Sequence, residues 1–144
     1  MTEAPRLTAM DVDTGIDDAM AIALATRSPE LALLAATTLA GNVDVERTTA
    51  NTLNVLDYLG AADVSVHPGA SHALARPHHD ASEHHGESGL GDAVLPLSER
   101  SAAAERGPAA IIRHAAARPG ELTLVCTGTL TNLAIALNVA PALP

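Results

Sequence analysis

The sequence contains no lysine, phenylalanine or tryptophan, and it has only one tyrosine and one cysteine. Because aromatic side chains are nearly absent, the core must be built from alanine, leucine, valine and isoleucine. Such side chains suit helices that pack on a buried sheet. The single cysteine, Cys126, excludes an internal disulfide and reads as a small core residue, which fits a reducing compartment.

Positive charge is also scarce. Eight arginines face 17 acidic residues, which gives a formal net charge of −9. An acidic surface without a basic cluster argues against nucleic acid or an anionic membrane as a partner. No apolar run reaches the length of a membrane span, and residues 1–6 lack the basic-then-apolar pattern of a signal peptide. We therefore expect a cytoplasmic protein, and the 144 residues suit a single α/β domain over residues 1–144.

Short apolar segments alternate along the chain with segments of helical spacing. Strands are predicted at Leu7–Met10, Leu31–Thr37, Ala62–His67 and Leu122–Cys126, and helices are predicted to begin near Asp17, Asp44, Glu105 and Asn132. This alternation implies right-handed crossovers between parallel strands. The predicted fold is an open, mostly parallel, Rossmann-like sheet with helices on both faces. In such a sheet all strands deliver their carboxyl ends to one edge, where ligands bind.

The segment Asp11–Asp18 places four carboxylates within eight residues, directly after the first predicted strand. Like charges this close together repel one another, so some would take up protons unless a cation neutralised them. Oxygen ligands suit calcium or magnesium better than zinc. The alternative is that Asp17 caps the following helix and that Asp17 and Asp18 interact only with its dipole. That alternative explains neither Asp11 nor Asp13.

Polar residues follow the other three strands too. Asn42 follows the second strand and Thr127 follows the fourth. An ordinary turn explains the Gly-Asn and Thr-Gly pairs as well as a functional role does. The third strand leads into residues 70–92, which lack periodicity and hold five histidines: His72, His78, His79, His84 and His85. Solvated loop histidines explain them better than zinc, because ligand spacing is irregular and no cysteine lies nearby. His85 stands apart, since Gly-Glu-Ser-Gly follows it.

Four motifs in the sequence resemble those of a known protein family. They are Asp11-x-Asp13-Thr-Gly-x-Asp17-Asp18, Thr37-Thr-x-x-Gly41-Asn42, His85-Gly-Glu-Ser-Gly-Leu90 and Thr127-Gly-x-Leu-Thr-Asn132. In this order the motifs resemble the successive signatures of the nucleoside hydrolases, including the inosine/uridine-preferring type. The resemblance implies a calcium-dependent hydrolase that cleaves a ribonucleoside, its small-molecule partner, to ribose and free base.

The resemblance also implies roles for single residues. Calcium would be held by Asp13, Asp18 and the backbone carbonyl of Thr127, ribose hydroxyls would bind Asp17 and Asn42, His85 would lie near the substrate, and Asp11 would support the loop. Asp13 would also take a proton from metal-bound water, whose pKa the cation lowers. Anionic groups beside the ribose would stabilise an oxocarbenium-like transition state.

Members of that family are considerably longer than this chain. Their second half supplies another acidic calcium ligand and the groups that handle the leaving base. We therefore expect the chain to be the N-terminal part of a nucleoside-hydrolase-like fold, with an incomplete sheet and an unpaired edge. Alone it is expected to be weakly active or inactive. A homo-oligomer or a complementing C-terminal half would be the protein partner.

Three other functions are considered. The first is a non-catalytic module that binds ribose and a cation, or half of a split enzyme. The second is a phosphatase of the haloacid dehalogenase type, in which Asp11 would attack phosphorus, but Gly15 stands where that motif has Thr or Val. The third, an EF-hand, is excluded because the loop has no Gly at its sixth position and no Glu at its twelfth.

Overall fold

The computed structural model describes residues 4–77 and 81–143, so His78 and His79 lie outside the described residues. The elements in chain order are β1 (Arg6–Val12), α1 (Ile16–Arg27), β2 (Leu31–Thr38), α2 (Val45–Tyr58), β3 (Ser65–Pro68), α3 (Ser82–His85), α4 (Gly107–Ala117), β4 (Thr123–Cys126) and α5 (Thr131–Val139). The predicted alternation is confirmed. One element, the single-turn helix α3, lies in the segment for which no periodicity was found.

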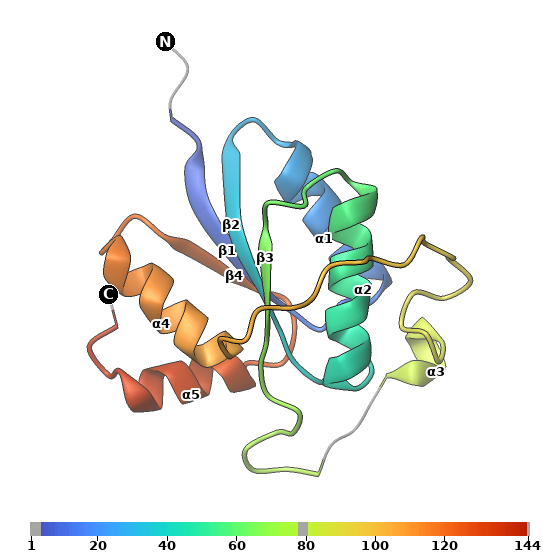
Figure 1. The fold of residues 1–144 in the computed structure, drawn as a ribbon. Coiled ribbons are helices and arrows are strands. Elements are labelled where there is room, and N and C mark those ends of the chain that lie inside the picture. The colour runs from blue at the N-terminus through green and yellow to red at the C-terminus, as the bar shows by residue number, and fades with distance from the viewer. Residues whose placement is uncertain (1–3, 78–80, 144) are drawn as a thin grey trace.

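The four strands form one sheet in the order β3-β2-β1-β4, and every neighbouring pair is parallel. Helices α1 and α2 cover one face of the sheet, while α4 and α5 cover the other (Figure 1). The predicted fold class, an open parallel sheet with helices on both faces, is therefore confirmed. Because all strands run the same way, the segments after β1, β2, β3 and β4 emerge at the same edge.

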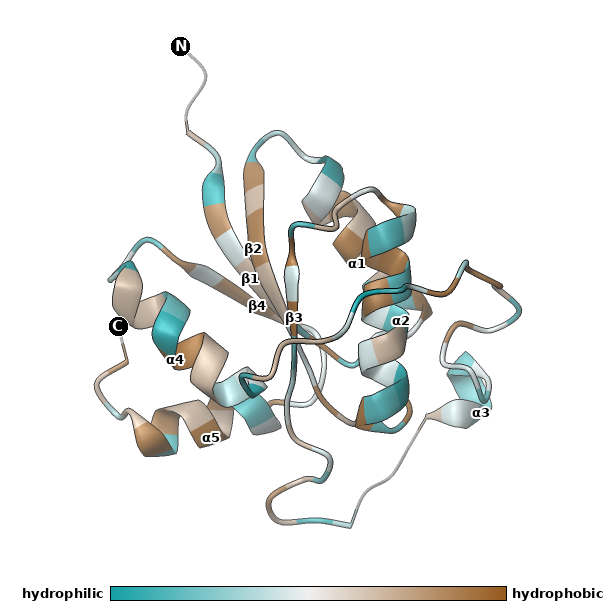
Figure 2. Cartoon of the chain, in the orientation of Figure 1, coloured by the Kyte–Doolittle hydropathy of each residue, from teal (hydrophilic) through white to brown (hydrophobic). Residues whose placement is uncertain are grey.

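The main core lies between the sheet and helices α1 and α2. It is aliphatic, as the composition requires, and its buried members include Met10, Val12, Ile22, Leu56 and Val66. Each such side chain contributes about 1.5 to 3 kcal/mol when it leaves water. Hydrophobic residues dominate β1 and β2, whereas hydrophilic residues mark much of α2 and α3 (Figure 2). Among the described residues, no helix is long and apolar enough to cross a bilayer.

Helix α2 begins and ends where the sequence predicts. The carboxylate of Asp44 accepts a hydrogen bond of 2.7 Å from the backbone N–H of Arg47, and Gly60 has a φ of +71° just after the last turn. Helix α1 differs, because its N-cap is Gly15 and the prediction of Asp17 as cap was wrong. Asp17 instead lies exposed in the first turn, and the Asp18 carboxylate accepts a hydrogen bond from the Gly15 N–H.

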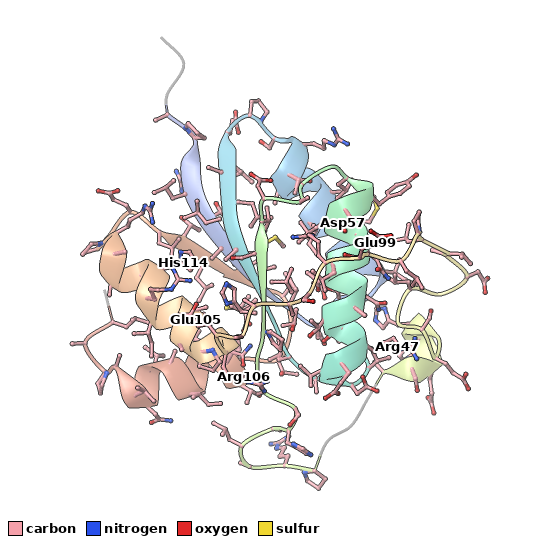
Figure 3. All side chains as sticks on the ribbon, in the orientation of Figure 1. Arg47, Asp57, Glu99, Glu105, Arg106 and His114 are labelled. Atoms are coloured by element: carbon pink, nitrogen blue, oxygen red, sulfur yellow. The ribbon has the colours of Figure 1, made fainter. Side chains whose placement is uncertain are left out.

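The two edge strands of the sheet, β3 and β4, differ in what lies beside them. Residues 98–106 run along β3, past Asp57 and Glu99 and on to Glu105 and Arg106 at the start of α4 (Figure 3). In this covering segment the Ala103 N–H donates to the Val66 carbonyl at 2.8 Å. Strand β4, at the other edge, pairs only with β1 within the described sheet. The predicted unpaired edge is therefore the outer side of β4.

Arg100 attaches the covering segment to the body of the protein. Its Nε contacts Asp57 Oδ1 at 2.6 Å, and one terminal nitrogen donates to the carbonyls of Ala62 and Val64 at 2.9 and 3.0 Å. Strand β3 begins at Ser65 and not at the predicted Ala62, because residues 61–64 form a turn in which the Val64 N–H donates to the Ala61 carbonyl at 3.2 Å.

Replacing Arg100 with Ala should lower the free energy of unfolding by about 2 kcal/mol, because three hydrogen bonds are lost and two carbonyls lose their partner. Urea denaturation monitored by circular dichroism measures the change. The control is Arg47→Ala on the exposed surface of α2, which should change stability by less than about 0.5 kcal/mol. Equal losses in the two variants would contradict the prediction.

Candidate functional site

The segments after β1, β2 and β4 meet at the carboxyl edge of the sheet. The backbone N–H of Asn42 donates to Asp13 Oδ2 at 2.8 Å, and the Asn42 side-chain amide donates to the Asp13 carbonyl at 3.1 Å. From the other side, the Thr127 hydroxyl donates to Asp18 Oδ1 at 2.5 Å. The structure thus brings together four of the residues that the sequence singled out: Asp13, Asp18, Asn42 and Thr127.

Asp13 and Asp18 form a pair of buried carboxylates. Asp13 is 7% exposed and Asp18 is 2% exposed. Burial, followed by the negative charge of Asp18, raises the pKa of Asp13 to about 6, although the N–H of Asn42 opposes the shift. Two carboxylates held together in this way repel each other at neutral pH. A cation between them would remove that repulsion.

The donor set fits a hard cation. Within residues 4–77 and 81–143, no three His, Cys, Asp or Glu side chains lie close enough together to hold a metal ion. The buried pair therefore offers two carboxylates, with the Thr127 turn beside them. Calcium and magnesium accept such oxygen ligands and complete their shell with backbone carbonyls and water, whereas structural zinc sites need more nitrogen or sulfur ligands.

Two glycines allow the backbone to close around Asp13. A Cβ atom on Gly128 would lie 2.9 Å from Asp13 Oδ1, and a Cβ atom on Gly41 would overlap the carboxylate. Both glycines belong to the sequence motifs, but sequence reasoning did not identify them as part of the site. The available signal was their position directly after a strand, where a glycine often permits a close backbone approach.

The remaining candidates lie at the rim. His85 reaches the start of α1, where its Nδ1 accepts a hydrogen bond of 3.3 Å from the Ile16 N–H, so this nitrogen carries no proton in that contact. Asp17 is exposed in the first turn of α1. His72 and His84 are also exposed, as expected for solvated loop histidines.

Two further groups are unsuited to act as nucleophiles. Asp11 is fully buried in β1, and its Oδ1 accepts hydrogen bonds from Thr37 Oγ1 at 2.5 Å and from Asn132 Nδ2 at 2.8 Å. This burial argues against the phosphatase alternative, which requires Asp11 to reach a substrate. Cys126 is partly buried at the end of β4, and burial raises the pKa of its thiol to about 11.

The model of the family described as "Inosine-uridine preferring nucleoside hydrolase" matches residues 8–144. The chain belongs to this nucleoside hydrolase family. Membership confirms the resemblance inferred from the four motifs, and the match includes every residue proposed for the site.

Individual nucleoside hydrolases are similar over nearly the whole chain. A non-specific ribonucleoside hydrolase from Klebsiella pneumoniae is 45% identical over 135 residues, which cover 92% of this chain and 43% of that protein. An inosine-uridine preferring nucleoside hydrolase from Leishmania major is 40% identical, over 95% of this chain and 44% of its own length.

Solved structures show the same relationship. The purine-preferring ribonucleoside hydrolase from Gardnerella vaginalis superposes with a TM-score of 0.91 at 37% identity, covering 96% of this chain and 45% of that chain. A plant nucleoside hydrolase has the same TM-score at 39% identity, and 44% of its chain is covered. The chain thus spans less than half the length of the nucleoside hydrolases that it matches.

Burial of Asp11 predicts an unusual pH dependence of stability in EDTA. Burial is the largest cause that raises the pKa of Asp11 from 3.8 to about 6. The folded state therefore favours the protonated acid. The contribution of Asp11 to the free energy of unfolding is complete below the pKa of the unfolded chain, and it is lost as pH rises through about 6. Between about pH 4.5 and 7 the wild type should lose about 2 kcal/mol relative to Asp11→Asn.

Urea unfolding of both proteins across this pH range tests the prediction. Asp63→Asn, at an exposed position, is the control and should differ from the wild type by a constant amount. A constant difference between wild type and Asp11→Asn would show that Asp11 does not titrate in this range.

Proposed function

We propose that this chain carries the cation-binding and ribose-binding part of a calcium-dependent ribonucleoside hydrolase, which cleaves the N-glycosidic bond to give ribose and free base. The observation that supports the proposal most is the buried pair of Asp13 and Asp18 beside the Thr127 turn. Family membership and the similarity to ribonucleoside hydrolases support the substrate class. The cytoplasmic location expected from the composition stays part of this proposal.

In the proposed mechanism Asp13, Asp18 and the backbone carbonyl of Thr127 would hold calcium, which would supply a lower pKa for water at the site. Asp13 would act as the base that accepts a proton from this water. Its Oδ2 accepts a hydrogen bond from the backbone N–H of Asn42, which holds the carboxylate in place. The pKa of about 6 for Asp13 applies to the protein without a cation; a bound cation would lower it and keep the carboxylate ionised, as a base requires.

The rim residues position the sugar. Asn42 and Asp17 hydrogen-bond ribose hydroxyls, and the exposed carboxylate of Asp17 is free to approach a ligand from solvent. His85 lies next to the substrate at the start of α1. The carboxylates near the sugar stabilise the positive charge that develops on the ribose ring as the glycosidic bond breaks.

Completion of the site requires more polypeptide than this chain contains. The unpaired side of β4 lies beside Thr127, so a strand added there would end next to the proposed cation. We propose that a complementing C-terminal half adds to this edge and supplies the groups that protonate the leaving base. A second copy of the chain is the other candidate partner. Without either, the chain binds cation and ribose but turns over little substrate.

Calcium binding should depend on the buried pair. Asp13→Asn and Asp18→Asn should each weaken calcium binding on the order of 100-fold, about 3 kcal/mol, because a charged ligand is lost. Isothermal titration calorimetry on the 144-residue chain measures the affinity. Asp63→Asn, an exposed carboxylate outside the site, is the matched control. Unchanged affinity in Asp13→Asn and Asp18→Asn would place the calcium elsewhere.

Hydrolysis by the isolated chain should be close to background. Inosine and uridine are incubated with the chain and calcium, and the reducing sugar released is measured against the Asp13→Asn variant. The expected result is little or no difference, since in the proposed mechanism a complementing half supplies the groups that protonate the leaving base. Turnover far above that of Asp13→Asn would show that this chain alone is a complete hydrolase.

A further inference from the structure

Asn132 joins three segments of the chain although it lies outside the proposed ligand set. Its side chain is fully buried. The amide nitrogen donates to Asp11 Oδ1 at 2.8 Å and to the Thr38 carbonyl at 3.0 Å, and the amide oxygen accepts from the Ala70 N–H at 2.9 Å. One side chain therefore links the start of α5 to β1, to β2 and to the loop after β3.

An amide is the group that these contacts require. Asn132 must donate on one side and accept on the other, which an aliphatic side chain cannot do. A carboxylate at this position would place a second buried negative charge against Asp11. The space is also closed, because a Cβ atom on Gly107 would lie 3.1 Å from the amide nitrogen and one on Gly69 would overlap the amide.

Asp11 holds both ends of the turn that leads from β4 to α5. Its backbone carbonyl accepts hydrogen bonds from the N–H groups of Thr127 and Gly128, at 3.0 and 3.3 Å. Its side-chain Oδ1 accepts from Asn132, at the far end of the same turn. Thr37 contributes a second donor to Oδ1 at 2.5 Å. Residues 127–132 are thus attached at both ends to one residue of the central strand.

This attachment sets the position of Thr127 relative to the carboxylate pair. Asp11 lies in β1, and Asp13 follows directly after the end of that strand, so the Thr127 turn and Asp13 share one support. A change in the hydrogen bonds of Asp11 would therefore move the Thr127 turn relative to Asp13 and Asp18. The three ligand groups themselves would be unchanged.

We propose that Asn132, Asp11 and Thr37 are positioning residues that fix the Thr127 turn opposite Asp13 and Asp18 and thereby set the affinity of the site for calcium. This inference rests on the proposed function, since it assumes that the site binds calcium. It differs from a purely structural role, in which the same residues would affect unfolding but not the affinity of the folded protein.

The test compares two buried threonine hydroxyls, of which one contacts Asp11 and the other does not. Thr37→Val removes the hydroxyl that contacts Asp11 and keeps the side-chain shape. Thr49→Val is the matched control, because Thr49 is a buried threonine of α2 whose hydroxyl contacts Thr38 at 2.7 Å and no ligand residue. Calcium affinity is measured by calorimetry, and stability is measured by urea unfolding in EDTA.

Both variants should lose stability, but only Thr37→Val should bind calcium more weakly, by about tenfold, the loss expected when a ligand loses its support. Thr37→Ser, which restores the hydroxyl, should recover the affinity. Asn132→Ser is the second variant, since its shorter side chain cannot bridge Asp11 and Ala70. It should weaken calcium binding at least as much as Thr37→Val.

Three results would overturn the inference. Wild-type affinity in Thr37→Val and Asn132→Ser would remove the positioning role and leave the proposed function intact. An equal loss of affinity in Thr49→Val would show general loosening of the fold. Absence of calcium binding by the wild-type chain would remove both the positioning role and the proposed calcium site.

Discussion

The structure is organised around two buried carboxylates of the same charge. Asp13 and Asp18 are held side by side where burial raises the cost of each charge, and burial together with Asp18 moves the pKa of Asp13 to about 6. An arrangement of this kind is unfavourable unless protons or a cation relieve it. The fold maintains it through the Asn42 N–H on Asp13 and the Thr127 hydroxyl on Asp18. The calcium ion proposed above would relieve the repulsion within this pair.

The parallel sheet is what makes this arrangement possible. Segments separated by more than a hundred residues, such as Asp18 and Thr127, meet because β1 and β4 are parallel neighbours that end together. The central strand β1 also supports the site from beneath, since Asp11 holds the turn after β4. The nucleoside hydrolases that match this chain are more than twice as long as the part that is matched. The unpaired side of β4 is consistent with a site that further polypeptide completes.

Much of the fold follows from local signals in the sequence. Apolar runs predicted all four strands, and Asp44 and Gly60 predicted both ends of α2 because capping and positive φ depend on single residues. The cap of α1 was predicted wrongly at Asp17. The N-cap is Gly15, and the carboxylate of Asp18, three residues later, accepts a hydrogen bond from the Gly15 N–H in a local contact of the capping-box type. The prediction failed because Gly15 was assigned only to the turn before the helix. The start of β3 was also misplaced, since the apolar pattern did not reveal the turn at residues 61–64, which the Val64 N–H closes on the Ala61 carbonyl.

In the candidate site, too, some residues were predicted from the sequence and others were not. Asp13, Asp18, Asn42 and Thr127 were identified because polar residues directly follow strands. The roles of Asn132, Gly41 and Gly128 were not, because these residues act through contacts made only when distant segments pack together. Asn132 reads in the sequence as an ordinary helix start, yet it bonds to residues 121 and 62 positions away. The residues of the proposed ligand set could thus be predicted from their positions after strands, whereas the residues that contact them through distant segments could be identified only from the structure.

The central claim, that the buried pair and the Thr127 turn hold one calcium ion, is tested most directly by a crystal structure of the chain grown with calcium or a lanthanide substitute. Anomalous scattering then locates the ion. The account predicts one strong peak in contact with the carboxylates of Asp13 and Asp18 and the backbone carbonyl of Thr127. A fully occupied ion elsewhere, with Asp13 and Asp18 unliganded, would contradict it.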